Sequence, residues 1–450
     1  TFLTFHTDME ERGGFECSDA VANKLQENTM RSAYSNFVHF PLDCPHREKN
    51  GWTGDAALSS EYMLLNFDAS KPFKQWLKCI CLAQNEKGAL PGIVPTGGWG
   101  FEWGNGPAWD AVLTYLPYYL YRFYGDKQVL SDCGEAISKY IDYLSGKRTE
   151  KGLIEFGLGD WCQTGRACHD YLTPSEVSNT LISIDICTKA AAIFNAIGDK
   201  SKYDKTVKLS DELKAAFNKH LLDESGTVVF GNTQTGQALA LFFGIFSGKK
   251  RRQAFDVLLN MIKGNGMRYD MGILGLRVLF RLLSQFDMSD LAYDMITSGE
   301  YPSYAYYLKF GATTLWEDFQ ILEEKDGYFR RADGNNLNSL NHHFFGDISG
   351  WFIQEISGIN INADLSDANS VMIKPSFIEK LQFAYGHATM PCGKLQCGWE
   401  RENDFVKVTV NVPEGCKCNF VAPAGYKIKN SRCKSIKLSG GKNIIECCNA

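Results

Sequence analysis

Several features that identify common classes of protein are missing from this sequence. No run of about 20 apolar residues occurs, so no segment is expected to cross a membrane. Basic residues are not in excess either: 47 Lys and Arg stand against 52 Asp and Glu, a net charge of −5. A nucleic-acid partner needs a basic surface to neutralise its phosphates. We therefore expect neither a membrane nor a nucleic acid as a partner.

The spacing of a zinc site is also missing, although cysteines are numerous. The chain has 15 Cys but no two C-x-x-C units, and pairs such as Cys79/Cys81 are spaced like neighbours on a strand or helix. We expect reduced, mostly buried thiols, no metal and no cofactor. Such thiols favour the cytoplasm, a reducing compartment. A secreted or periplasmic location stays an alternative if a signal peptide has been lost upstream, and the oligomeric state stays open.

What the sequence does contain is a long helical region between about residues 18 and 358. Apolar residues recur at helical spacing, as do Phe73, Trp76 and Ile80. Pro107 and Gly125 are a typical start and stop signal. Twelve helices are predicted, over residues 19–35, 55–66, 72–84, 107–124, 131–145, 176–197, 200–220, 234–246, 250–262, 272–285, 289–298 and 348–357.

The links between these helices alternate between short and long. The long links are rich in Gly, Trp, Asp and Glu and cover residues 36–54, 85–106, 146–175, 221–233, 263–271 and 299–347. If consecutive helices are antiparallel, all the long links lie at one end, and six helical hairpins close into an (α/α)6 barrel. Five of the nine Trp fall in these links, where exposed rings can stack on sugars.

Beyond about residue 362 the period of the pattern changes to two. Four valines between Val406 and Val412 alternate with polar residues and predict a strand that ends at Pro413. The segment 439–442, Ser-Gly-Gly-Lys, predicts a hairpin turn between two further strands. The predicted fold is mainly α: a barrel at 14–361 and a C-terminal antiparallel β-sandwich at 362–450. Residues 1–8 alternate like a strand, so residues 1–13 are predicted to be the remnant strand or linker of an upstream β domain.

The segment 43–55 holds the densest set of chemically active side chains. Three carboxylates (Asp43, Glu48 and Asp55) accompany Arg47 and Trp52 between turn-forming Pro and Gly residues. Hydrolysis of a glycosidic bond needs a carboxylic acid with a raised pKa to protonate the leaving oxygen, and Glu48 is the candidate. The two aspartates would raise the pKa of Glu48 and Arg47 would lower it, a balance that the sequence leaves open.

Glu317, in the last long link, is the candidate for the second carboxylate. A general base that activates water must lie across the sugar from the acid, and the ring would bring both links to the same face. Aromatic and polar residues of the long links and the adjoining helix ends are expected to hold the sugar. They are Trp52, Trp109, Asp110, Asp160, Trp161, Trp316 and His342.

These motifs resemble those of the bacterial α-L-rhamnosidases of glycoside hydrolase family 78. The resemblance runs from about residue 13 to the end of the chain. It is carried in order by Phe15–Ser18, Asp43–Glu48, Gly51–Asp55, Pro107–Trp109, Gly159–Trp161, Ala312–Glu317 and Asn341–His342.

The resemblance implies an (α/α)6 catalytic barrel followed by a β-sandwich and an inverting mechanism, with Glu48 as general acid and Glu317 as general base. It also implies a terminal α-L-rhamnose as the group removed, and it suggests as the groups around that sugar Asp43, Arg47, Asp55, Trp52, Trp109, Trp161 and His342. Two differences stand out. Family members usually carry several β-sandwich domains before the barrel, and many read Ala-Trp-Gly-Asp where this chain has Ala108, Trp109 and Asp110.

Three alternatives are consistent with parts of the pattern. An inverting (α/α)6 glycosidase for a different sugar would use the same carboxylates. A polysaccharide lyase on the same scaffold would use Tyr and His and would need Arg and Lys for acidic sugars, whereas acid and Trp prevail here. A non-catalytic carbohydrate-binding remnant would keep the tryptophans but would not need both Glu48 and Glu317.

Overall fold

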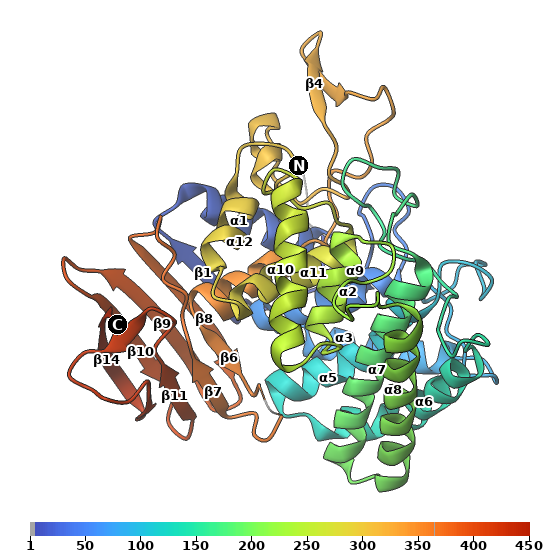
Figure 1. Ribbon diagram of the computed structural model, residues 1–450, viewed down its shortest axis with the longest axis horizontal. Helices are drawn as coiled ribbons and strands as arrows, with labels where there is room; N and C mark the ends of the chain where they lie inside the picture. The colour runs from blue at the N-terminus through green and yellow to red at the C-terminus, as the bar shows by residue number, and fades with distance from the viewer. Residues whose placement is uncertain (1–4, 364) are drawn as a thin grey trace.

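The computed structural model describes residues 5–363 and 365–450 of the chain. A helical part lies to the right in Figure 1 and a smaller part built from β-sheets lies to the left. The helices lie between residues 20 and 356, and ten of the strands, β1 and β6 to β14, form the two large sheets. These two parts correspond to the predicted barrel and sandwich, and the fold class is confirmed.

The helices follow the predicted ranges to within a few residues. They are α1 (Ala20–Ser35), α2 (Thr53–Asn66), α3 (Ser70–Ala83), α4 (Pro107–Asp110), α5 (Val112–Tyr124), α6 (Lys127–Gly146), α7 (Ser175–Ile197), α8 (Lys200–His220), α9 (Gln234–Phe242), α10 (Gly248–Gly264), α11 (Ile273–Gln285), α12 (Ser289–Thr297) and α13 (Asp347–Trp351). The predicted helix 107–124 is divided at Ala111, and α13 continues as a π-helical turn, Phe352–Ile356.

Six of the helices form a closed inner ring. In the order α2, α5, α7, α9, α11 and α13 each contacts the next, and α13 contacts α2. Helix α2 is buried on every side, as an inner helix must be, whereas outer helices such as α3 bury only one stripe. The arrangement is the predicted (α/α)6 barrel.

Helix α7 is the one described helix that is long and apolar enough, by length and composition, to cross a membrane. Of its most apolar window, 61% is buried inside the structure. It packs against α5, α6, α8 and α9, so its composition follows from its place in the inner ring.

The links that join an outer helix to the following inner helix are the long ones, as predicted. The last of them carries two elements that were not predicted: the 3-10 helix η1 (Ala305–Phe310), and a hairpin of β4 (Leu322–Lys325) and β5 (Tyr328–Arg331). The hairpin projects from the barrel at the top of Figure 1. The first long link contains a small pair of strands, β2 (Phe37–Val38) and β3 (Phe40–Pro41).

The β part consists of two sheets. The six-stranded sheet has the order β1 (Gly13–Cys17), β8 (Phe383–Met390), β9 (Gly393–Arg401), β10 (Val406–Val412), β14 (Gly441–Asn449) and β12 (Tyr426–Ile428). The four-stranded sheet has the order β13 (Ser435–Leu438), β11 (Lys417–Val421), β7 (Ser370–Ile373) and β6 (Ile359–Ile361). Strand β10 coincides with the predicted strand, and its valines are buried.

Three details of the β part differ from the prediction. The turn at 439–442 does not close a hairpin, because β13 and β14 belong to different sheets. Strands β7 and β11 are parallel, so the sandwich is not wholly antiparallel. Residues 5–8 form no strand, residues 1–4 lie outside the described residues, and the first large strand, β1, pairs with β8. The division into 1–13, 14–361 and 362–450 stays a prediction.

A buried group of charges lies between the inner helices. Glu61 of α2 lies 3.2 Å from the guanidinium of Arg122 and 3.5 Å from those of Arg277 and Arg281. Arg281 also donates two hydrogen bonds of 2.9 Å to Asp347. Burial would raise the pKa of Glu61, but the three arginines hold it below its ordinary value. The charges thus link α2, α5, α11 and α13.

We expect Glu61→Gln to lower the free energy of unfolding by about 3–5 kcal/mol, because it leaves buried arginines without their counter-charge. Chemical denaturation followed by circular dichroism measures the change. Glu135→Gln is the control: Glu135 is 74% exposed in its pair with Lys202, so its loss is expected to change the free energy by less than about 0.5 kcal/mol. Equal effects of the two variants would contradict this assignment.

Candidate active site

A cavity that is open to solvent lies among the long links. Its lining comes from four long links and from the first turns of α2, α4 and α11. The lining residues are Asp43, Glu48, Trp52, Asp55, Trp99, Trp103, Trp109, Leu158, Trp161, Ile273, Glu317, His342 and Phe344. Both predicted catalytic carboxylates and six of the predicted sugar contacts therefore meet in one place.

Glu48 lies at the exposed side of this cavity. Its Oε2 accepts a hydrogen bond of 2.8 Å from the indole N–H of Trp52 and a longer one of 3.5 Å from the side-chain amide of Asn50. Lys49, the next residue, has the left-handed φ of 59° that a tight turn requires. The turn and the indole hold the carboxyl group in the cavity while leaving it in contact with solvent.

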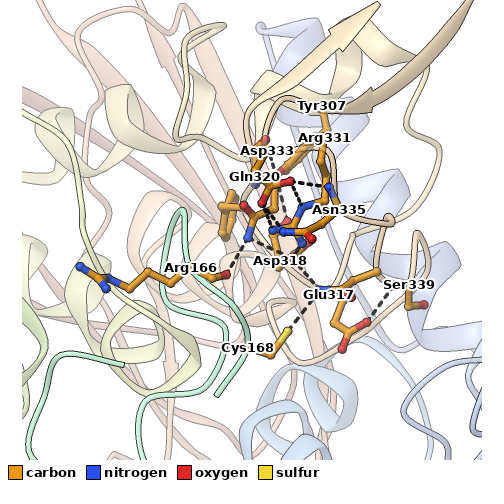
Figure 2. A network of polar contacts seen from close by, with 12 residues as sticks. Arg166, Cys168, Tyr307, Glu317, Asp318, Gln320, Arg331, Asp333, Asn335 and Ser339 are labelled. Carbon is orange, nitrogen blue, oxygen red and sulfur yellow. Dashed lines mark hydrogen bonds and ion pairs between the residues drawn. The ribbon is translucent and has the colours of Figure 1, made fainter. Parts of the chain in front are cut away.

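Glu317 is half-buried and approaches the cavity from the last long link. Its Oε2 accepts a hydrogen bond of 2.8 Å from the backbone N–H of Ser339, and its own N–H donates to the carbonyl of Ser339 at 2.9 Å (Figure 2). No hydrogen bond reaches its other oxygen, Oε1, from the residues that the structure describes. One carboxylate oxygen is thus held while the other is free to accept a proton.

Asp318, the next residue, anchors this segment from the other side (Figure 2). Its buried carboxylate accepts hydrogen bonds from Asn338 at 2.7 Å and from Gln320 at 3.1 Å, and it lies 3.4 Å from Arg331. Burial raises the pKa of Asp318, and these partners counteract the rise. The network connects the segment around Glu317 to the base of the β4–β5 hairpin.

Asp55 and His342 form a buried pair that joins the first hairpin to the last. His342 Nε2 lies 2.9 Å from Asp55 Oδ1, in the first turn of α2, where a helix N-terminus stabilises negative charge. Burial lowers the pKa of His342, but the hydrogen bond and charge of Asp55, with the charges of Glu317 and Asp43, raise it above its ordinary value overall. The pair therefore favours a protonated imidazole beside three carboxylates.

Five tryptophans form a continuous aromatic wall. Trp52 contacts Trp99 and Trp103 with ring centroids 5.7 Å apart, Trp103 contacts Trp161 at 6.4 Å, and Trp161 contacts Trp109 at 6.2 Å. The rings of Trp99 and Trp103 are nearly half exposed. Such a wall offers apolar ring faces to the C–H face of a sugar.

Two glycines make room for this wall. A Cβ at Gly54 would lie 2.6 Å from the indole of Trp109, and a Cβ at Gly104, where φ is +76°, would lie 2.5 Å from the indole of Trp52. Both distances are shorter than van der Waals contact allows. Glycine at these positions lets the backbone lie directly against the rings.

The lining also contains polar atoms that need a partner. The indole N–H of Trp109 and Nδ1 of His342 are buried and have no hydrogen-bond partner among the described residues. Buried polar groups are rarely left unpaired, since this costs about 1–3 kcal/mol each. Their presence beside an aromatic wall indicates a ligand that carries hydroxyl groups.

Comparison with known proteins identifies the family of the chain. Residues 10–356 match the family model of the bacterial α-L-rhamnosidase 6 hairpin glycosidase domain, and residues 369–436 match that of the bacterial α-L-rhamnosidase C-terminal domain. The chain belongs to this family. The resemblance that the motifs indicated is confirmed.

Relatives within the family cover nearly all of this chain. The α-L-rhamnosidase of Alteromonas sp. is 29% identical over 433 residues, 94% of this chain and 46% of that protein. The structure of the α-L-rhamnosidase from Dictyoglumus thermophilum has a TM-score of 0.89 at 26% identity, covering 99% of this chain and 51% of that chain. The Streptomyces avermitilis α-L-rhamnosidase complexed with L-rhamnose has a TM-score of 0.84 at 24% identity, covering 99% and 42%. This chain therefore spans about half the length of the relatives it matches.

Four predicted sugar contacts lie outside the lining in this member of the rhamnosidase family. Asp110 is buried and accepts a hydrogen bond of 2.9 Å from Tyr140. Asp160 is buried and accepts hydrogen bonds of 2.8–3.2 Å from backbone N–H groups at the start of α11, so it caps that helix. Trp316 stacks on Phe329, and Arg47 is exposed to solvent. These four residues do not line the cavity, and their predicted contacts with a sugar stay predictions.

Five residues of the lining were not among the predicted site residues of this family member: Trp99, Trp103, Leu158, Ile273 and Phe344. The two tryptophans had a signal, since they flank a Gly-rich run in a long link. The three apolar side chains had no such signal, because an apolar residue at a helix end or in a link is normally interpreted as part of the hydrophobic core.

The raised pKa of Asp43 predicts how the stability of this rhamnosidase-family fold depends on pH. Burial, and then the charge of Asp55, raise the pKa of Asp43 to about 6, against hydrogen bonds from Cys44 and Asn50. A carboxyl group whose folded-state pKa is raised stabilises the fold below its unfolded pKa and loses that contribution as pH rises to 6 and beyond. As pH rises from about 4 to 7, the free energy of unfolding of Asp43→Asn should therefore increase relative to that of wild type, by on the order of 2–3 kcal/mol.

Denaturation curves of both proteins at several pH values measure this difference. A difference that stays constant, or that shrinks as pH rises, would contradict the raised pKa of Asp43.

Proposed function

We propose that this chain removes terminal α-L-rhamnose from glycosides or oligosaccharides by an inverting hydrolysis. Glu48 acts as the general acid and Glu317 as the general base. The observation that carries the proposal is the cavity itself, in which two carboxylates from links far apart in the sequence face an aromatic wall. The three relatives named above are α-L-rhamnosidases, which supports rhamnose as the sugar.

Glu48 suits the role of acid because of its exposure. A general acid must donate its proton to the leaving oxygen and be reprotonated before the next turnover. The leaving group of a terminal sugar departs towards solvent, and the exposed carboxyl of Glu48 lies on that side. The N–H of Trp52, 2.8 Å from Oε2, fixes one oxygen and leaves the other to hold the proton.

Glu317 suits the role of base because its carboxylate has one oxygen free. Inversion requires a water molecule between the base and the anomeric carbon, on the face opposite the leaving group. The N–H of Ser339 orients the carboxylate through Oε2, which allows Oε1 to take the proton of that water.

The lining combines features that suit a 6-deoxy sugar. Rhamnose carries a methyl group where most hexoses carry a hydroxymethyl group, so its site needs an apolar patch. Leu158, Ile273 and Phe344 supply such a surface in the cavity. The unpaired polar atoms of Trp109 and His342 are available to the hydroxyl groups.

The alternatives fit the cavity less well. A lyase for acidic sugars needs basic side chains, but in the part of the chain that the structure describes no Arg, Lys or Tyr lines this cavity. A non-catalytic binding remnant gives no reason for two carboxylates at the same cavity as the tryptophans. A glycosidase for a different sugar is separated from the proposal by assaying a panel of aryl glycosides that includes the α-L-rhamnoside.

We expect Glu48→Gln to lower the turnover of a poorly activated α-L-rhamnoside by at least about 100-fold, because general acid catalysis contributes about that much. An activated aryl rhamnoside should lose much less, since its leaving group needs little protonation. Glu317→Gln is the matched control and should slow both substrates alike, because both need the same attacking water. If Glu48→Gln also slows both substrates equally, Glu48 is not the acid.

The mechanism also predicts the stereochemistry of the product. An inverting enzyme keeps its two carboxyl groups about 6.5–9.5 Å apart to admit water, whereas a retaining enzyme needs about 5–5.5 Å. We therefore expect the β-anomer of L-rhamnose as the first product from an α-linked substrate. Proton NMR of the fresh hydrolysate, recorded before mutarotation, measures this, and early α-anomer would rule the mechanism out.

A further inference from the structure

We propose that Cys162, Cys168 and Glu317 form a binding site for a thiophilic divalent cation such as Zn²⁺, and that the bound ion inhibits hydrolysis. The inhibition rests on the proposed function of Glu317, whereas the binding itself does not. One oxygen of the Glu317 carboxylate and the two Sγ atoms lie within 4.8 Å of one another. No other group of three such side chains comes this close among residues 5–363 and 365–450.

The distances suit a tetrahedral ion after a small contraction. Zinc binds sulfur at about 2.3 Å and carboxylate oxygen at about 2.0–2.2 Å, which places neighbouring ligand atoms about 3.5–3.8 Å apart. The half-buried side chains of Cys168 and Glu317 have the freedom to make this adjustment. Water or a substrate hydroxyl would complete the fourth position, as in zinc sites that have three protein ligands.

The two cysteines are held together by the backbone of one link. The N–H of Cys162, a residue in the left-handed region with φ of 55°, donates a hydrogen bond of 2.8 Å to the carbonyl of Cys168. The Sγ of Cys168 lies 3.2 Å from the side-chain amide of Asn338, in the link that carries Glu317 (Figure 2). The third ligand thus comes from a different hairpin, which is why the cysteine spacing alone predicted no metal site.

The chemistry of the ligands selects the ion. Two thiols and one carboxylate favour soft or borderline cations, whereas Mg²⁺ and Ca²⁺ prefer oxygen ligands alone. Binding releases one proton from each thiol to solvent and leaves Zn²⁺ coordinated by two thiolates and the carboxylate. A reducing compartment, which the cysteine content favours, keeps both thiols available.

The effect on the reaction follows from the shared ligand. While its carboxylate is bound to a metal ion, Glu317 is a much weaker base and accepts a proton from the attacking water poorly. The ion would therefore lower the turnover number without destroying the fold, and a chelator would reverse the loss. Cys168 reaches the ion without lining the sugar cavity, so its replacement separates binding of metal from catalysis.

The test begins with freshly reduced protein and Cd²⁺, whose bonds to thiolates give charge-transfer absorption in the near ultraviolet. We expect wild type to reach saturation near one equivalent, with Zn²⁺ displacing Cd²⁺. Cys168→Ser should lose the signal, and Glu317→Gln should weaken binding at least about tenfold. Cys81→Ser is the matched control and should keep the signal: its thiol lies 3.8 Å from that of Cys133, a second close pair.

The activity arm uses an aryl rhamnoside that the wild-type protein hydrolyses. Zn²⁺ should inhibit wild type and the Cys81→Ser variant, with full recovery after chelation, whereas Cys168→Ser should stay active at a zinc concentration at least about tenfold higher. Equal absorption by wild type and Cys168→Ser would overturn the site, as would a reduced protein that gives no absorption. Cadmium absorption without any hydrolysis would support the metal site and overturn the proposed function instead.

Discussion

The candidate active-site cavity depends on the hydrogen bonds that close the ring between the first and the last hairpin. Asn28 of α1 donates to the carbonyl of Ala312 at 3.0 Å, and Ser32 accepts from the N–H of Leu315 at 2.8 Å. The N–H of His342 then donates to the carbonyl of Leu315 at 2.8 Å. These bonds fix the segment around Glu317 against the helix that precedes the Glu48 link. Without closure, the two candidate carboxylates would belong to opposite ends of an open array of helices.

The barrel was predictable because its signals are local and repeated. Each outer helix has an apolar stripe at helical spacing, and the long links alternate with short ones, so the sequence indicates both the hairpins and the end that carries the site. The β4–β5 hairpin had no comparable signal. Its strands have four residues each, are mostly exposed and include charged side chains, so no alternation of apolar residues marks them. It is held instead by the contact of Arg331 with Asp318.

The sequence indicated which types of residue form the site, but not which of their side chains point into the cavity. Asp160 and Trp161 are neighbours in a link with the composition of a sugar-binding loop, yet only Trp161 reaches the cavity. Asp160 turns to the start of α11, whose N–H groups need an acceptor. Trp316 illustrates the same limit, because its ring packs against Tyr307 and Phe329 at the base of the hairpin. Which side chain faces the sugar is decided by partners that lie far away in the sequence.

Glu317 and Asp318 are adjacent carboxylates of one segment, the first a candidate general base and the second structural. Asp318 is buried, and an arginine and two side-chain amides all contact its Oδ2, so its carboxylate stabilises the link. Those bonds also fix the backbone from which Glu317 extends, so that a single N–H is enough to orient its carboxylate. A reactive group needs a fixed position and a free oxygen together. In this barrel Asp318 fixes the position and Glu317 keeps the free oxygen, and one oxygen of the same Glu317 carboxylate lies within 4.8 Å of two thiols.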